Sequence, residues 1–238
     1  MWKWILGGIV ALVAIGAFVL PHAMRFFQAS MTADPAFWER AIVAFEEADR
    51  IDPPAPGAVL FVGSSSIVYW SSLEADMAPL RVLNRGFGGA QFSHVLHNLD
   101  RVVVPYRPRA VVVYAGDNDL DEVTGKNAQR VFDDYQNFVA RVRERLPDTR
   151  FYFLAIKPSI ARWARWPEMS QANAMIEAWS QGDERLAYLD VATPLLGEDG
   201  QPREEFFVFD GLHLSAEGYA AWARAVRPRL VADLGVAD

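Results

Sequence analysis

The sequence predicts an α/β protein, with a parallel sheet covered by helices on both faces. Short apolar runs without polar alternation, such as residues 59–62 and 110–114, are typical of strands buried on both faces. Amphipathic segments separate these runs, and the clearest covers residues 128–146. Strands that alternate with helices pair in parallel, because each crossover returns the chain to the same edge of the sheet.

The first half of the folded region is expected to contain three of the strands. Asp34-Pro35 starts a helix, with Asp as the cap and Pro at the first helical position, and this helix ends near Arg50. The proline-rich loop 52–57 is stiff and leads into the first strand. The elements expected next are the strand 58–62, a short helix over 68–77, a strand over 81–84, a glycine-rich turn over 85–89, a helix over 93–103 and a strand over 110–114.

The second half continues the alternation of helices and strands. The expected elements are a helix over 128–146, a strand over 150–156, a helix over 168–181, a strand over 186–190 and a polar turn over 197–203. Ser215 caps a final helix, in which Pro228 should produce a kink or the end. The inward positions of this helix are Tyr219, Trp222, Val226 and Leu230.

Composition excludes several classes of function. A chain of 238 residues suggests one large domain, or a domain with an appendage. A net charge of -7 argues against nucleic-acid binding, and the absence of cysteine excludes disulfides, thiolate metal sites and a cysteine nucleophile. No pair among the four histidines has a zinc-protease spacing, and His94 and His97 are expected on a helix surface. We therefore expect neither a metal nor a cofactor.

The amino-terminal segment is uncharged from Trp4 to Leu20, a length at the lower edge of what spans a bilayer. No convincing cleavage site follows, so residues 1–33 are interpreted as an uncleaved signal anchor with a linker, and a cleaved signal peptide is the alternative. Lys3 favours a cytoplasmic amino terminus. The folded domain, residues 34–238, is then expected at the membrane, on its periplasmic or exterior side.

Three strands end in polar turns that contain glycine: Gly63-Ser64-Ser65, residues 86–89 and residues 116–118. The carboxyl ends of parallel strands lie at one edge of the sheet, and Asp210-x-x-His213 can reach that edge. A serine nucleophile needs a base, the base needs an acid, and the developing oxyanion needs N–H donors. The sequence therefore predicts a serine-based site, with Ser64, Ser65 and Ser66 as candidate nucleophiles.

These blocks resemble the SGNH (GDSL-like) hydrolase superfamily, which has a serine motif, a glycine, Gly-x-Asn-Asp and Asp-x-x-His in this order. The matching positions are Gly63-Ser64-Ser65, Gly89, residues 116–119 and residues 210–213. The resemblance implies a flavodoxin-like three-layer α/β/α sandwich with five parallel strands. It also implies Ser65 as the nucleophile, His213 as the base and Asp210 as the acid, with an oxyanion hole from the Ser65 and Gly89 amides and the Asn118 side chain.

One position departs from the family pattern, because Ser64 stands where an aspartate usually precedes the nucleophile. Gly63 lies two residues before Ser65, which favours Ser65 over its neighbours. Arg85 beside the glycine turn is a candidate substrate contact. The loop after the fourth strand is expected on the substrate side and supplies two more candidates, Lys157 and Trp163.

The leading functional hypothesis is a serine ester hydrolase that acts through an acyl-enzyme on a small-acyl, lipid or carbohydrate ester. An acyltransferase that moves acetyl groups on cell-envelope glycans with the same triad is the alternative. A nucleotide- or flavin-binding protein is disfavoured, because the chain has neither a Gly-x-Gly-x-x-Gly motif nor a phosphate loop. An intact triad argues against an inactive membrane-tethered binding module. Ile67 in place of the last glycine of Gly-x-Ser-x-Gly argues against an α/β-hydrolase.

Overall fold

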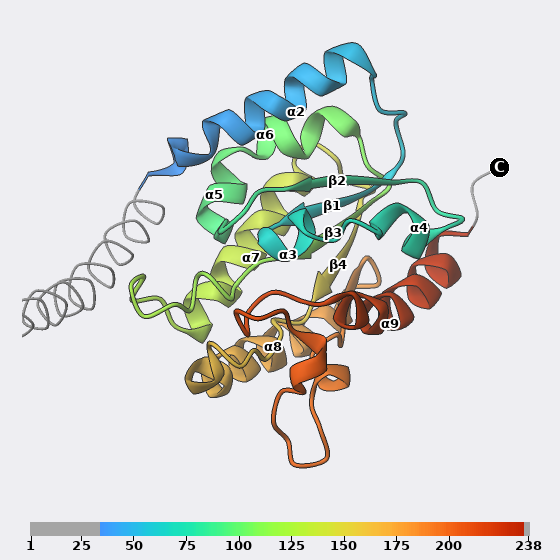
Figure 1. Ribbon diagram of the computed structural model, residues 1–238. Coiled ribbons are helices and arrows are strands. Elements are labelled where there is room, and N and C mark those ends of the chain that lie inside the picture. Colours follow the sequence, from blue (N-terminus) through green and yellow to red (C-terminus); the bar gives the residue numbers. More distant parts are fainter. Residues whose placement is uncertain (1–33, 236–238) are drawn as a thin grey trace, which may run out of the picture.

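A computed structural model describes residues 34–235 of the chain. Within this range the strands form one parallel five-stranded sheet in the order β2-β1-β3-β4-β5 (Figure 1). The strands are β1 (Val59–Gly63), β2 (Val82–Gly86), β3 (Ala110–Tyr114), β4 (Arg150–Leu154) and β5 (Leu186–Leu189). The predicted fold class is confirmed, including the flavodoxin-like strand number.

The register of the central strands brings their carboxyl ends to one level. Gly63 at the end of β1 pairs with Gly86 of β2 on one side and with Tyr114 of β3 on the other. The turns that follow these three strands therefore leave the sheet side by side, as a site at the edge of a parallel sheet requires.

One face of the sheet is covered by the larger group of helices. Their apolar side chains pack with Leu60, Val62, Val111 and Val113 from the central strands in one buried cluster. The helices are α2 (Glu39–Ile51), α5 (Phe92–His97), α6 (Leu99–Val102), α7 (Ala128–Arg143) and α8 (Trp166–Ser180), and 3-10 turns lie at Pro35–Trp38, Val104–Tyr106 and Trp163–Arg165.

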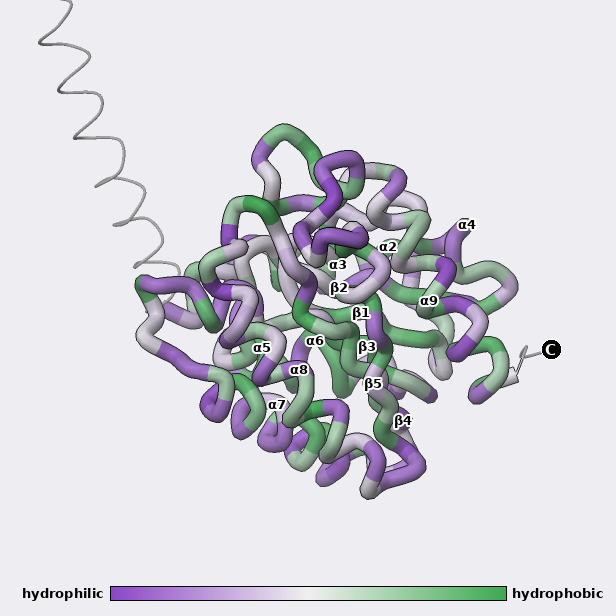
Figure 2. Tube along the Cα trace, turned by 90° about the horizontal axis from the view of Figure 1, so that it is seen from below, coloured by the Kyte–Doolittle hydropathy of each residue, from purple (hydrophilic) through white to green (hydrophobic). Residues whose placement is uncertain are grey.

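The opposite face packs against α3 (Ser65–Val68), α4 (Leu73–Met77) and α9 (Ala216–Leu234). A second buried cluster there joins Phe61, Val112 and Tyr114 of the sheet to Trp70 and Trp222. Short 3-10 turns at Thr193–Leu195 and Glu204–Phe206 lie before α9 in the chain. Figure 2 shows the consequence, since β1 and β3 are hydrophobic along their length and lie inside a more hydrophilic outer layer.

Two predicted helices are each divided into two shorter ones. The segment 68–77 separates into α3 and α4, because Trp70 is buried while its indole N–H donates to Asp76 at 2.7 Å across the intervening turn. The segment 93–103 separates into α5 and α6 at Asn98, whose side-chain amide donates to the His94 carbonyl at 3.0 Å. Side chains that bind nearby backbone groups compete with a continuous helix.

Two further expectations, for Pro228 and for His94, are corrected in part or in full by the structure. Pro228 does not end the last helix, because α9 continues to Leu234 while Trp222, Val226 and Leu230 remain buried against the sheet. Packing of an apolar face outweighs one lost backbone hydrogen bond. His94 is buried rather than on the surface, and its Nδ1 accepts hydrogen bonds from the Gln91 N–H and the Trp38 indole.

The predicted membrane anchor, residues 4–20, lies outside the described residues. Among the helices from residue 34 to residue 235, none has the length and apolar character needed to cross a bilayer.

Candidate active site

The end of β1 fixes the position of Ser65. Gly63 has φ of 136°, and a Cβ atom there would lie 1.9 Å from the Tyr114 carbonyl oxygen, so the strand can end in this way only with glycine. The Ser64 N–H then donates to the same carbonyl at 3.0 Å. Ser65 is consequently the first residue of α3, at the carboxyl edge of the sheet.

Ser65, His213 and Asp210 form a continuous hydrogen-bonded chain. His213 Nε2 lies 2.9 Å from Ser65 Oγ, and His213 Nδ1 lies 2.6 Å from Asp210 Oδ2. Ser64 and Ser66 are almost completely buried, at 0% and 1% exposure. Among the three adjacent serines, Ser65 is therefore the one that the fold presents to the imidazole.

The loop that carries Asp210 and His213 is closed by its own backbone. Val208 N–H donates to the His213 carbonyl at 2.9 Å, and Ala161 N–H donates to the Gly211 carbonyl at 3.0 Å from the neighbouring loop. Asp210 Oδ1 accepts from the backbone N–H groups of Leu212 and His213 at 2.8 and 2.9 Å. Partial burial raises the pKa of Asp210, but the hydrogen bonds from His213 and Leu212 outweigh it, and the net pKa is lowered. The carboxylate is therefore held ionised beside the imidazole.

The three predicted oxyanion donors lie in the segments that follow β1, β2 and β3 at the carboxyl edge of the sheet. Within residues 34–235, neither the Ser65 N–H nor the Gly89 N–H donates to another described residue. Gly89 has φ of 74°, a conformation that favours glycine. Asn118 follows β3, and its Nδ2 donates to the Ala90 carbonyl at 3.1 Å, which connects the second and third of these segments.

A charged cluster lies beside Asn118. Asp117 is buried and has two cationic neighbours, Lys157 Nζ at 3.5 Å and Arg162 Nη1 at 3.4 Å. Burial raises the pKa of Asp117, but the charges of Lys157 and Arg162 outweigh it and lower the net pKa. Burial also lowers the pKa of Lys157, against the opposing effect of Asp117.

The three predicted substrate contacts, Arg85, Lys157 and Trp163, lie in different environments in the structure. Arg85 faces the helix layer on the other side of the sheet, where it pairs with Asp49 and donates to the Tyr106 hydroxyl at 2.8 Å, so the prediction that it contacts substrate is wrong. Lys157 is 1% exposed and lies against Asp117 and the Tyr114 ring, which gives it an internal position. Trp163 is half-buried and stacks on Trp166 with a centroid distance of 6.1 Å, and its substrate role stays a prediction.

Sequence reasoning placed Arg162 in the loop on the substrate side, but it identified neither Tyr69 as a neighbour of the site nor the contact of Arg162 with Asn118. The Tyr69 ring packs edge-on against His213 with a centroid distance of 4.9 Å. Arg162 donates to Asn118 and to the Asp117 carbonyl. Tyr69 directly follows α3, so its nearness to Ser65 in the chain could have indicated a place beside the site. No sequence pattern predicts that Arg162 contacts Asp117 and Asn118, which lie 45 and 44 positions earlier.

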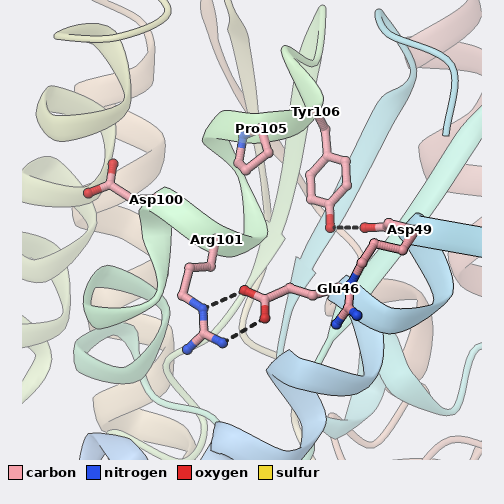
Figure 3. Close-up of a pocket in the computed structure, with 7 residues that line it drawn as sticks. Glu46, Asp49, Asp100, Arg101, Pro105 and Tyr106 are labelled. Carbon is pink, nitrogen blue, oxygen red and sulfur yellow. Dashed lines mark hydrogen bonds and ion pairs between the residues drawn. The ribbon is translucent and has the colours of Figure 1, made fainter. Parts of the chain in front are cut away.

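Other sites are easily distinguished from this one. Among residues 34–235, no group of three metal-ligating side chains is close enough to hold an ion. A separate groove lies between α2 and α6 and is lined by charged residues that include Glu46, Asp49 and Arg101 (Figure 3). Its lining contains no serine and no histidine, so the hydroxyl–imidazole–carboxylate arrangement is found at the edge of the sheet and not in this groove.

A hydroxyl–imidazole–carboxylate chain at the carboxyl edge of a parallel sheet defines the class of α/β serine hydrolases. The model of the GDSL-like Lipase/Acylhydrolase family matches residues 62–221, which is more than half of the chain. The protein belongs to this family, as the four motifs indicated, and it is an ester-hydrolysing enzyme. No curated protein matches the chain.

Solved structures share the fold at low sequence identity. A Streptococcus pneumoniae protein provisionally described as a platelet activating factor has 22% identity and a TM-score of 0.71, with 81% of this chain and 92% of that chain covered. A GDSL-like lipase from Bacteroides thetaiotaomicron has 19% identity and a TM-score of 0.67, with coverage of 85% and 100%. A catalytic mutant of an acetylxylan esterase from Geobacillus stearothermophilus has 13% identity and a TM-score of 0.59, with coverage of 77% and 96%.

Proposed function

We propose that the protein hydrolyses carboxylic esters through an acyl-enzyme formed on Ser65. The observation that carries this proposal is the hydrogen-bonded chain Ser65–His213–Asp210, with distances of 2.9 and 2.6 Å. A serine hydroxyl is a weak nucleophile without a base, and an imidazole acts as base only when its other nitrogen is held in the right tautomer. Asp210 meets that requirement by accepting a hydrogen bond from the Nδ1–H of His213.

In the first half of the reaction, Ser65 Oγ attacks the ester carbonyl while its proton passes to His213 Nε2. The Ser65 and Gly89 amides and one N–H of Asn118 Nδ2 stabilise the tetrahedral oxyanion. When the intermediate collapses, the C–O bond to the alcohol breaks, and His213 returns the proton to the departing oxygen. In the second half, His213 removes a proton from water, which attacks the acyl carbon. The bond from that carbon to Ser65 Oγ then breaks, His213 returns the proton to Oγ, and the acid is released.

The acyl and alcohol groups are proposed only as a class. A shallow groove of about 360 Å³ borders Asp210, and the exposed apolar side chains of Ile160, Val208 and Phe209 line it. Apolar side chains around a groove that reaches Asp210 favour an ester with an apolar portion. The fold shared with an acetylxylan esterase keeps acetylated sugars among the candidates.

The test is covalent labelling combined with an ester panel. A fluorophosphonate should label the wild-type protein, and peptide mapping should place the adduct on Ser65. A panel from short to long acyl chains, with acetylated sugars included, then defines the substrate. A folded wild-type protein that reacts with neither the probe nor any ester would overturn the proposal. An adduct on Ser64 or Ser66 would overturn the choice of nucleophile.

Transfer of the acyl group to a glycan hydroxyl would use the same triad, with an alcohol in place of water. No feature of the described residues favours that acceptor, so hydrolysis is the proposed reaction. Adding an alcohol acceptor to the assay separates the two reactions, since transfer yields a new ester rather than free acid.

We also propose that the amino-terminal segment anchors the enzyme, with its folded domain outside the cytoplasm. The support is the uncharged run from Trp4 to Leu20, together with Lys3 on its amino-terminal side. Full-length protein should sediment with membranes and resist carbonate extraction, whereas a chain starting near Met31 should be soluble. Recovery of the intact full-length chain in the soluble fraction would exclude the anchor.

A further inference from the structure

We propose that Arg162 is a positioning residue, which fixes the side-chain amide of Asn118 so that one N–H of Nδ2 is directed to the oxyanion. This inference rests on the proposed role of Asn118 as an oxyanion donor. Its starting observation is the hydrogen bond of 3.1 Å from Arg162 Nη2 to Asn118 Oδ1. Nothing in the motif that contains Asn118 requires this partner.

The two ends of the Asn118 amide have opposite partners. The guanidinium of Arg162 can only donate, so it meets Oδ1, whereas the carbonyl of Ala90 can only accept, so it meets Nδ2 at 3.1 Å. If the amide turned over, its NH2 group would face the guanidinium and its oxygen would face a carbonyl. Both contacts would then be repulsive, and the oxyanion would face a lone pair instead of an N–H.

This orientation leaves one donor for the reaction. Nδ2 carries two N–H groups, and Ala90 takes one of them. A donor held in place before the reaction stabilises developing charge without reorganisation, which is the main source of its effect. Ala90 alone leaves Oδ1 without a partner, so Arg162 supplies the second point that prevents rotation.

Arg162 is itself held in one place. Its Nη1 donates to the Asp117 carbonyl at 3.1 Å and lies 3.4 Å from the Asp117 carboxylate, and its Nη2 lies 3.5 Å from Asp121. Its side chain is 14% exposed. The planar fork of arginine reaches these acceptors together, which a lysine ammonium with its single nitrogen cannot do. The guanidinium is thus fixed by the same loop that it orients.

The chain offers a matched control in the same loop. Arg165 lies three residues later, and its guanidinium forms a more exposed ion pair with Glu122 at 3.5 Å. Arg162→Met and Arg165→Met remove the same charge and similar volume from neighbouring positions. Only the first removes a donor to Asn118.

The experiment measures hydrolysis of a small uncharged ester, p-nitrophenyl acetate, by the full-length protein in detergent. Arg162→Met should lower kcat by about 10- to 100-fold, with KM changed by less than about twofold, because a misplaced donor weakens transition-state binding. Arg165→Met should stay within about twofold of wild type. Arg162→Lys, which keeps a charge for Asp117, should recover melting temperature more than it recovers kcat.

The decisive measurement is a double-mutant cycle. If Arg162 acts through the Asn118 amide, Arg162→Met should lower kcat by less than about twofold in an Asn118→Ala background. Full additivity of the two losses would overturn the inference, and so would an unchanged kcat in Arg162→Met. If Arg162→Met does not fold, the same cycle is run with Arg162→Lys. An inactive wild type would instead overturn the proposed function, so the two failures are distinguishable.

Discussion

Two charged regions of this molecule use the same residue types for different ends. In the groove between α2 and α6, Arg101 binds both carboxylate oxygens of Glu46, at 2.6 and 2.9 Å, and the Tyr106 hydroxyl donates to Asp49 at 2.5 Å (Figure 3). At the edge of the sheet, Asp117 lies between Lys157 and Arg162. The first set of contacts ties one helix to another, whereas the second surrounds a loop that carries Asn118.

The two networks differ in whether a hydrogen-bond donor remains available for another molecule. In the groove, carboxylates and guanidinium groups are matched to one another, and the contacts serve the packing of the helices. Beside Asn118, the donors and acceptors hold an amide that retains one N–H not used by any of residues 34–235. A groove lined by charged residues is therefore not by itself an indication of a reactive site. A rigidly held donor with an unused N–H is a stronger indication.

Substitutions at the proposed nucleophile and base give the strongest test of the comparison between the edge of the sheet and the groove. Ser65→Ala and His213→Ala should each lower kcat by at least about 10⁴-fold, since the triad acts as a unit. Ser64→Ala and Ser66→Ala, at buried neighbouring hydroxyls, should retain measurable turnover. Steady-state kinetics checks all four. A Ser65→Ala protein with near-normal turnover would mean that the edge of the sheet is no more reactive than the groove.

Asp117→Asn tests how much the charged cluster beside Asn118 contributes to the stability of the fold. Removing this carboxylate leaves Lys157 and Arg162 without their shared partner, and we expect a loss of about 3–5 kcal/mol in the free energy of unfolding at neutral pH. The folded pKa of Asp117 lies below its ordinary value of 3.8, so its stabilisation is complete above that value and is lost as the pH falls through the folded pKa.

The measurement for Asp117 is the melting temperature of wild type and variant across pH. The difference between the two proteins should be full at neutral pH and should shrink in acid below about 3.8. A difference that grows on acidification would contradict the lowered pKa.

Asn118→Ala tests the donor itself. Loss of one oxyanion-hole donor should lower kcat by about 10²–10³-fold, equivalent to about 2.7–4 kcal/mol of transition-state stabilisation. KM and melting temperature should change little. Steady-state kinetics and thermal unfolding, each compared with wild type, measure these two quantities. A loss of folding as large as the loss of rate would show that Asn118 serves the turn instead.

The groove, together with the ion pair that Arg85 makes with its lining residue Asp49, should give the smallest effects on rate. Arg85→Met breaks a largely buried ion pair with Asp49, so we expect about 3 kcal/mol of destabilisation with kcat within about twofold of wild type. Arg101→Gln removes exposed pairs, and the melting temperature should fall by no more than about 2–4 °C. A large loss of kcat in either folded variant would make the groove part of the active site.

The strands and the site motifs were predictable because their signals are local. An apolar run such as Ala110–Tyr114 identifies its own strand, and Asp210 and His213 identify each other by spacing. The substrate role assigned to Arg85 failed because side chains alternate across a strand, and its register places it with Val62 beneath the α2 layer. The contact of Arg162 with Asn118 joins loops 44 residues apart, which no periodic pattern encodes.

The closeness of Asp210 and His213 in the chain has a mechanical consequence. They are three residues apart in one loop, whereas Ser65 is 148 residues away on another element. A displacement of the whole loop would therefore preserve the distance between Asp210 and His213 and change the distance from His213 to Ser65 Oγ. In the proposed mechanism, activation of Ser65 therefore depends on the position of this loop, which the Ala161–Gly211 hydrogen bond helps to hold. The free energy of a local opening of this loop would then set the fraction of molecules competent to react at any instant.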